Sequence, residues 1–229
     1  MIDCHQLTRG DDAMREPGSA GEHQAQAMFG TGRRALAFYN KQMLDYLNGP
    51  MRDFIAQREF VFISTADSRG ECDCSFRAGP HGFVQSLDDR TLIYPEYRGN
   101  GVLASVGNIL ENPHIGMLFV EFVQHSIGLH ANGSAEILET DEAARRFGRQ
   151  LAMQLDPESG RKPELWILVT ISEAYIHCSK HIPRYSETHK AIHWGTDDDQ
   201  RKGGDFFKAK ECPRSWVGRR PSPEDAERA

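Results

Sequence analysis

Four short segments in the first half of the chain combine apolar and β-branched residues in a pattern that is typical of strands. These segments are FVFISTA (60–66), ECDCSF (71–76), GFVQSL (82–87) and TLIYP (91–95). The turn-forming stretch 67–70 and the pair Asp88 and Asp89 separate them. The pattern therefore predicts four strands joined as an antiparallel meander.

The second half of the chain has longer apolar segments. IGMLFVEF (115–122) is nearly continuous, and IGLHANGSAEILE (127–139) contains Gly133, which predicts a bulge or sharp bend. A helix is expected from Asp141 to about residue 155, with Thr140 or Asp141 as its cap. The stretch 164–179 predicts one long strand or two bent ones. Together these elements indicate a mainly β, α+β domain or a β-barrel.

Two helices are expected before the strands. From Arg33 the apolar residues fall on one broad helical face, through Leu47. Asn48 and Gly49 mark the end of that helix, and Pro50 begins a second one that runs to about Arg58. The domain prediction is a mobile arm over 1–32, one folded domain over 33–195 and a polar, flexible tail over 196–229.

Net charge, the length of the apolar runs and the number of cysteines limit what the protein can bind and where in the cell it is expected. The 229 residues carry a net charge of −6, which argues against general binding to nucleic acid or anionic membrane. The apolar runs are too short to span a bilayer, and the amino terminus lacks the apolar core of a secretion signal, so a cytoplasmic location is expected. The five scattered cysteines are typical of reduced thiols.

One candidate ligand site is the stretch YRGNGVLASVGNILENP (97–113). Gly99 and Gly107 allow the backbone to approach a ligand, and a helix expected over 101–110 would begin beside Arg98 and Asn100. Backbone N–H groups, a helix dipole and a guanidinium together suit a phosphate. A short connecting helix with a Gly-Asn cap is the alternative explanation.

A second candidate is CDCSFRAGPHGFVQS (72–86). Ser75 and Arg77 are two positions apart, so they share one face of a strand end, just before a Gly-Pro-His-Gly turn. Such a strand end can hold an anionic or polar planar ligand. The alternative is an ordinary hairpin with an exposed Arg.

The third candidate is AYIHCSKHIPRYS (174–186). His177, Cys178 and His181 could be metal ligands with Cys72 and Cys74, but Cys-x-Cys lacks the usual zinc spacing, and neighbouring strand residues point to opposite faces. Structural or cofactor-edge roles are favoured over zinc, and no metal is expected. Lys180 and Arg184 are basic side chains at the end of this segment and could bind an anion.

These three stretches, in this order, resemble the pyridoxamine 5'-phosphate oxidase-like family of FMN-binding split β-barrels over residues 35–195. The resemblance implies a six-stranded antiparallel split barrel with flanking helices. It also implies a homodimer that binds FMN at the subunit interface. The chain lacks the Lys- and Arg-rich phosphate loop and the carboxyl-terminal substrate motifs of the vitamin B6 enzymes, so that biosynthetic role is not expected.

The resemblance assigns three groups of cofactor-binding residues. The strand residues that would run along the flavin ring are Ser75, Phe76 and Arg77. The residues that would lie near the phosphate and ribityl chain are Arg98, Asn100, Gly101, Ser105 and Asn108. The residues that would reach the flavin of the partner subunit are Lys180 and Arg184.

The expected activity is that of an FMN-dependent oxidoreductase acting on an unidentified small molecule. The cofactor F420 in the same cleft is one alternative. A non-catalytic flavin- or haem-binding protein, with His177 or His181 as an axial ligand, is another. No catalytic residue can be assigned, because His81 and His177 are possible proton donors that are more simply explained as structural histidines.

Overall fold

The computed structural model describes residues 17–151, 161, 163–188, 190–194, 196, 198 and 200–216. The chain divides after residue 189 into two compact units, and the site discussed below lies in the first. The first sixteen residues of the expected arm, the end of the expected helix at 152–155 and the tail from 217 onward lie outside the described residues. The domain boundaries expected from the sequence therefore stay predictions.

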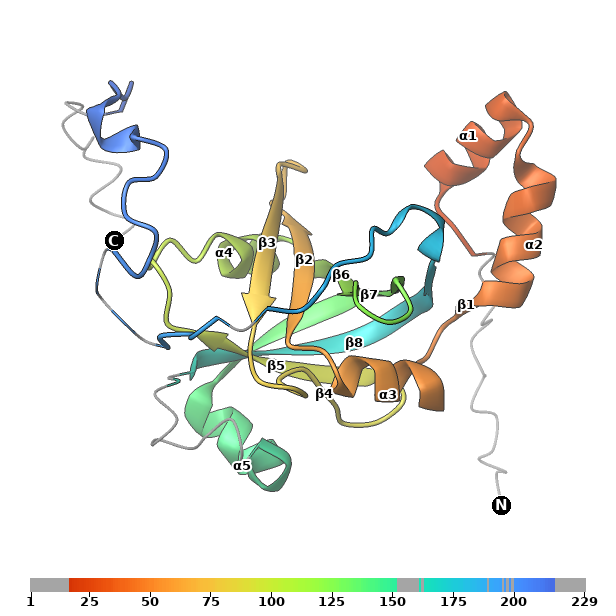
Figure 1. Ribbon diagram of the computed structural model, residues 1–229. Helices are drawn as coiled ribbons and strands as arrows, with labels where there is room; N and C mark the ends of the chain where they lie inside the picture. The colour runs from red at the N-terminus through yellow and green to blue at the C-terminus, as the bar shows by residue number, and fades with distance from the viewer. Residues whose placement is uncertain are drawn as a thin grey trace, which may run out of the picture. The chain divides into compact units, whose positions relative to one another are not determined.

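The first unit is built on one antiparallel sheet of eight strands in the order β3-β2-β6-β7-β8-β5-β4, with β1 paired to β8 (Figure 1). The strands are β1 Met43–Leu44, β2 Phe60–Ala66, β3 Cys72–Ala78, β4 Gln85–Ser86, β5 Thr91–Tyr97, β6 His114–Glu121, β7 Ile127–Glu139 and β8 Pro163–His177. Six of them have seven residues or more. The prediction of a mainly β, α+β fold with six antiparallel strands is confirmed.

The predicted meander is wrong, because the hairpins β2–β3 and β4–β5 lie at opposite ends of the strand order. The segment between β3 and β4 crosses from one end to the other, and Phe83 and Val84 are buried in the core instead of pairing. The predicted strand 82–87 therefore shrinks to Gln85–Ser86. Gly79 permits the crossing, since a Cβ there would lie 2.4 Å from the side chain of Phe83. Among the described strands, β3 and β4 do not pair with each other, so the barrel-like sheet is not closed.

The bulge expected at Gly133 is confirmed. The register of β7 against β8 shifts between Asn132 and Gly133. A Cβ on Gly133 would lie 1.9 Å from the carbonyl oxygen of Thr170, so the strands can approach this closely only at glycine.

Five α-helices accompany the sheet in the described part of the chain. They are α1 Ala20–Phe29, α2 Gly32–Gln42, α3 Gly49–Ala56, α4 Ala104–Glu111 and α5 Thr140–Leu151, with short 3-10 turns at Ser179–His181 and Ala209–Glu211. None of them is long and apolar enough to cross a lipid bilayer.

Helix boundaries follow the expected caps in part. Pro50 occupies the first turn of α3, as expected. Asn48 was expected to end the preceding helix, but that helix ends at Gln42, and the side chain of Asn48 instead caps α3 by accepting a hydrogen bond from the backbone N–H of Met51. Met43 and Leu44 were expected in the preceding helix, but they form β1, because they pair with Tyr175 and Ala174 of β8. Helix α1, inside the predicted arm, was not anticipated.

The core has two parts. The larger one fills the inner face of the sheet, with β2 supplying Val61 and Ile63. Helix α5 covers a second cluster on β5, β7 and β8, centred on Trp166, which is fully buried. Helix α4 packs against β2, β3 and β7, which places its amino-terminal turn beside the inner face of β3 (Figure 1).

Candidate functional site

Five polar side chains meet between β3, β5 and α4, and we call them the polar cluster: Asp73, Ser75, Arg77, Glu96 and Ser105. The alternation of β3 brings its three members to one face. Their register partners on β2 are the buried residues Thr65, Ile63 and Val61, so this face is the inner one. Because β3 is at the end of the strand order, the polar cluster lies at the open edge of the barrel.

An ion pair anchors the polar cluster. Arg77 Nε donates to Glu96 Oε2 at 2.8 Å, and the two side chains are only 19% and 12% exposed. A second guanidinium nitrogen of Arg77 donates to Ser105 Oγ at 3.4 Å. The charges of Arg77 and Glu96 therefore compensate each other in a largely buried setting.

Asp73 gathers the hydroxyl groups of the polar cluster. Its Oδ2 accepts a hydrogen bond from Ser75 at 2.7 Å and one from Ser105 at 3.0 Å. The two serine oxygens are themselves 3.4 Å apart. The network thus connects β3 to the first turn of α4, where Ser105 is buried.

Burial shapes the electrostatics at the base of the polar cluster. It raises the pKa of Glu96, and the hydrogen bond and charge of Arg77 oppose that rise. Burial also raises the pKa of the neighbouring Tyr94, with a smaller contribution from Glu96. The hydroxyl group of Tyr94 is buried and has no hydrogen-bond partner in the described part of the chain.

Phe76 points away from the polar cluster, because it lies between Ser75 and Arg77 on the strand. Its side chain is 56% exposed and stacks on Phe60, with ring centroids 5.4 Å apart. Phe62, Phe122 and Tyr185 extend this arrangement, and we call these five residues the aromatic surface. The strand thus separates a polar inner face from an aromatic outer face.

The loop before α4 is exposed and tightly turned. Asn100 Oδ1 accepts a hydrogen bond from the backbone of Val102 at 3.0 Å, and Gly101 adopts a positive φ of 80°. Arg98 and Asn100 are exposed in this loop. The helix begins at Ala104, later than expected, because Leu103 takes the left-handed conformation with φ 52°.

Asn108, on the next turn of α4, faces the sheet. Its amide donates to Thr65 Oγ1 at 3.0 Å. The contact fixes α4 against β2, which gives Asn108 a structural role in the chain as it stands.

The late basic residues are not joined to the polar cluster by any contact that the structure describes. Lys180 is exposed in the turn after β8, and Arg184 donates to the carbonyl oxygen of Gln124 at 2.9 Å. Their predicted role at the flavin of a partner subunit stays a prediction.

The histidines considered as proton donors have structural partners. Nδ1 of His81 lies 2.9 Å from the carbonyl oxygen of Gln57. Nδ1 of His177 on β8 lies 2.9 Å from Nε2 of His130 on β7. The pKa of His130 is lowered mainly by burial and, to a smaller extent, by the charge of His177. Among the described residues, no group of three or more His, Cys, Asp or Glu side chains could hold a metal ion.

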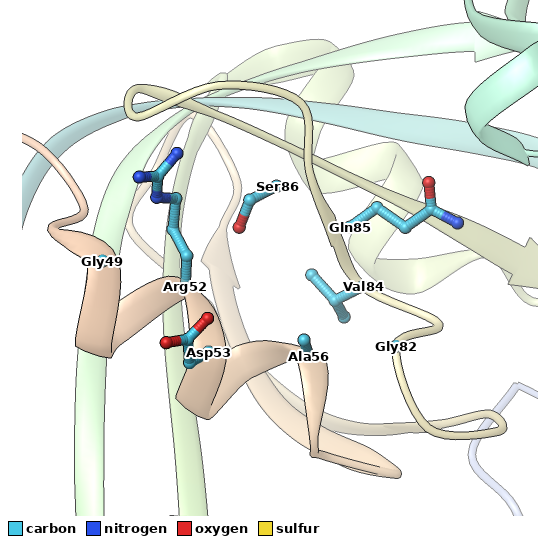
Figure 2. A pocket seen from close by; sticks show the side chains of 8 residues that line it. All are labelled: Gly49, Arg52, Asp53, Ala56, Gly82, Val84, Gln85 and Ser86. Atoms are coloured by element: carbon cyan, nitrogen blue, oxygen red, sulfur yellow. The ribbon is translucent and has the colours of Figure 1, made fainter.

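A cavity of about 390 Å³ lies between α3 and β4 (Figure 2). Its walls are Gly49, Arg52, Asp53, Ala56, Gly82, Val84, Gln85 and Ser86. None of the ten residues assigned from the resemblance lines it. Sequence reasoning gave no sign of this cavity, because α3 and β4 come together only when the segment between β3 and β4 crosses the barrel. That crossing was not predicted.

Sequence reasoning also missed two members of the polar cluster. Asp73 could have been found, because it continues the alternation of Ser75 and Arg77. Glu96 could have been suspected as an acid inside the apolar segment TLIYPEY, but its pairing with Arg77, nineteen positions away, is a tertiary contact.

Solved structures with similar folds match the chain at low identity. One is an FMN-binding protein from Syntrophomonas wolfei (15% identity, TM-score 0.41, covering 69% of this chain and 97% of that one). Another is an F420 reductase (13% identity, TM-score 0.39, covering 54% of this chain and 94% of that one). A third is HutZ, the haem storage protein from Vibrio cholerae (17% identity, TM-score 0.36, covering 57% of this chain and 94% of that one).

Family comparison is more specific. No curated protein is significantly similar to the chain. The family model described as pyridoxamine 5'-phosphate oxidase matches residues 47–178, which is more than half of the sequence and spans β2 to β8, including the whole polar cluster. The chain belongs to the pyridoxamine 5'-phosphate oxidase family.

Proposed function

We propose that the protein is an FMN-dependent oxidoreductase that acts on a small molecule other than the vitamin B6 precursors. The observation that carries this proposal is the polar cluster, because three hydrogen-bond donors assigned to the cofactor, Ser75, Arg77 and Ser105, converge there. Membership of the family supports the flavin as the cofactor.

The residues of the polar cluster fit one part of FMN better than another. Asp73 and Glu96 offset the charge of Arg77, so the polar cluster suits the neutral, hydrogen-bonding edge of the flavin ring or the ribityl hydroxyls. A phosphate needs donors with fewer carboxylates nearby, and the exposed loop with Arg98, Asn100 and Gly101 fits that requirement.

Bound FMN would supply the electron or hydride transfer. The chain would bind and orient the cofactor through Ser75, Arg77 and Ser105, and helix α4 would exclude water from the inner side of the site. Arg77 would donate hydrogen bonds to the edge of the ring, and its pairing with Glu96 would hold the guanidinium in one orientation.

The proposed assembly is a homodimer with the cofactor at the interface. Its support is the aromatic surface, where Phe76 exposes an apolar side chain on the back of the strand that carries Ser75 and Arg77. Light scattering is expected to give a dimer for the natural protein and a monomer for Phe76→Glu. A monomeric natural protein would refute this assembly.

The function is tested by the absorbance spectrum of the purified protein, with mass spectrometry of whatever heat releases. Flavin bands and released FMN are expected, followed by bleaching when NADH, NADPH or reduced F420 is added without oxygen. A protein that binds F420 instead of FMN, shows a haem Soret band, or holds a flavin that none of these donors reduces would contradict the proposal.

A further inference from the structure

We propose that the cavity between α3 and β4 binds a small zwitterion, a molecule with a carboxylate and an ammonium group such as a short α-amino acid. The proposal goes beyond the flavin reaction and does not rest on it. Its basis is three polar side chains at the cavity, those of Arg52, Asp53 and Ser86, which have no partner among the described residues.

The two charged residues of the cavity lie side by side on α3. Arg52 and Asp53 both line the cavity, and both are exposed. Neither side chain forms a hydrogen bond or ion pair with any residue that the structure describes. Consecutive helical residues point about 100° apart, so the geometry of α3 keeps the two charges from neutralising each other.

The strand side contributes a third unpartnered group. Ser86 Oγ is buried and has no hydrogen-bond partner in the described part of the chain. Figure 2 shows this hydroxyl directed toward α3, where Arg52 and Asp53 lie, whereas the amide of Gln85 points away. A buried hydroxyl without a partner is uncommon in native proteins, and a ligand in the cavity would satisfy it.

The chemistry of the walls selects the ligand. A guanidinium pairs with a carboxylate, and the carboxylate of Asp53 pairs with an ammonium group. Val84 and Ala56 supply an apolar wall for a short aliphatic side chain, while Gly49 and Gly82 leave space. The volume of about 390 Å³ is near the lower end of the range for small-molecule sites, which favours a ligand of amino-acid size.

A simple anion fits this cavity less well than a zwitterion does. Asp53 beside Arg52 would repel a second negative charge, and an amine alone would face Arg52. We therefore expect a ligand with both charges to bind at least about tenfold more tightly than a ligand with either charge alone, because only that ligand forms charged hydrogen bonds with both Arg52 and Asp53.

The test is a titration of the full-length protein with L-alanine, propionate and ethylamine, followed by NMR or calorimetry. Saturable binding of L-alanine is expected, with propionate and ethylamine at least about tenfold weaker. Arg52→Gln and Asp53→Asn are each expected to weaken L-alanine binding by about tenfold or more, and Ser86→Ala by a few-fold.

The matched control is Arg34→Gln, an exposed residue of α2 outside the cavity, which is expected to leave L-alanine binding unchanged. All variants are expected to keep the natural melting temperature within a few degrees and the natural FMN content. No saturable binding of L-alanine, equal binding of propionate, or equal loss in the control would overturn the proposal. A protein without FMN that still binds L-alanine would separate this site from the proposed function.

Discussion

The polar cluster and the cavity between α3 and β4 both contain an arginine, an acidic residue and a serine, but they use them differently. In the polar cluster, Arg77 and Glu96 are largely buried and paired with each other. At the cavity, Arg52 and Asp53 are exposed, and their side chains have no partner among the described residues. The first arrangement is tied to the stability of the fold, whereas the second leaves its charges available to a ligand.

The largest effect is expected from Arg77→Ala. It leaves Glu96 buried without its partner, so the free energy of unfolding is expected to fall by about 3–5 kcal/mol. The double variant Arg77→Gln, Glu96→Gln removes both charges and is expected to recover most of that loss. Guanidinium unfolding curves measure both, and equal losses in the single and double variants would contradict the pairing.

Glu121 differs from the acidic residues of both sites, because backbone N–H groups hold its carboxylate. Glu121 accepts hydrogen bonds from the backbone N–H groups of Val123, Gln124, His125 and Ser126. Burial acts to raise the pKa of Glu121, but these donors outweigh it and lower the pKa to about 2. Glu121→Gln is expected to cost about 2 kcal/mol at neutral pH, measured by denaturant unfolding.

The sign of the pH dependence follows from that pKa. The stabilisation by Glu121 is present above its ordinary pKa of 4.5 and is lost as pH falls toward 2. The natural protein is therefore expected to lose more stability than Glu121→Gln in that window. Parallel curves for the two proteins would show that the four backbone contacts do not hold the carboxylate.

Glu96 is expected to show the opposite pH dependence, with a smaller effect. Its pKa is raised on folding, so its contribution is most favourable below the ordinary value of 4.5 and is lost as pH rises through the folded value. The free energy of unfolding, measured from pH 4 upward, is expected to decline less in Glu96→Gln than in the natural protein. A steeper decline in the variant would contradict burial as the dominant cause.

The smallest effect on stability is expected at the cavity. Arg52→Ala removes an exposed, unpaired side chain, so the free energy of unfolding is expected to change by no more than about 0.5 kcal/mol. A loss comparable to that of Arg77→Ala would show that the two arginines do not differ as described.

Local patterns in the sequence were sufficient for most elements of the fold. The bounds of β2 follow from a run of apolar and β-branched residues before a turn, and the bulge in β7 follows from Gly133; both signals are local. Even α1 had local signals, since Ser19 caps it and Gly30 ends it.

Features that depend on distant parts of the chain could not be predicted in this way. Met43 and Leu44 leave the helical pattern because β8 offers them a pairing partner. The crossing from β3 to β4 depends on the burial of Phe83, and the pairing of Arg77 with Glu96 depends on that same arrangement of strands. The site was therefore predictable as a set of donors on β3 and α4, but its compensating acids and the second cavity were not.

The central claim is that the polar cluster holds FMN, and the most direct test is the dissociation constant for FMN of the double variant Arg77→Gln, Glu96→Gln, measured by quenching of flavin fluorescence. Because this variant removes both members of the ion pair without leaving either charge buried alone, it is expected to stay folded and to bind FMN about tenfold or more weakly, while Arg69→Gln in the exposed β2–β3 turn is expected to bind as the natural protein does. Equal FMN affinity in all three proteins would contradict the claim.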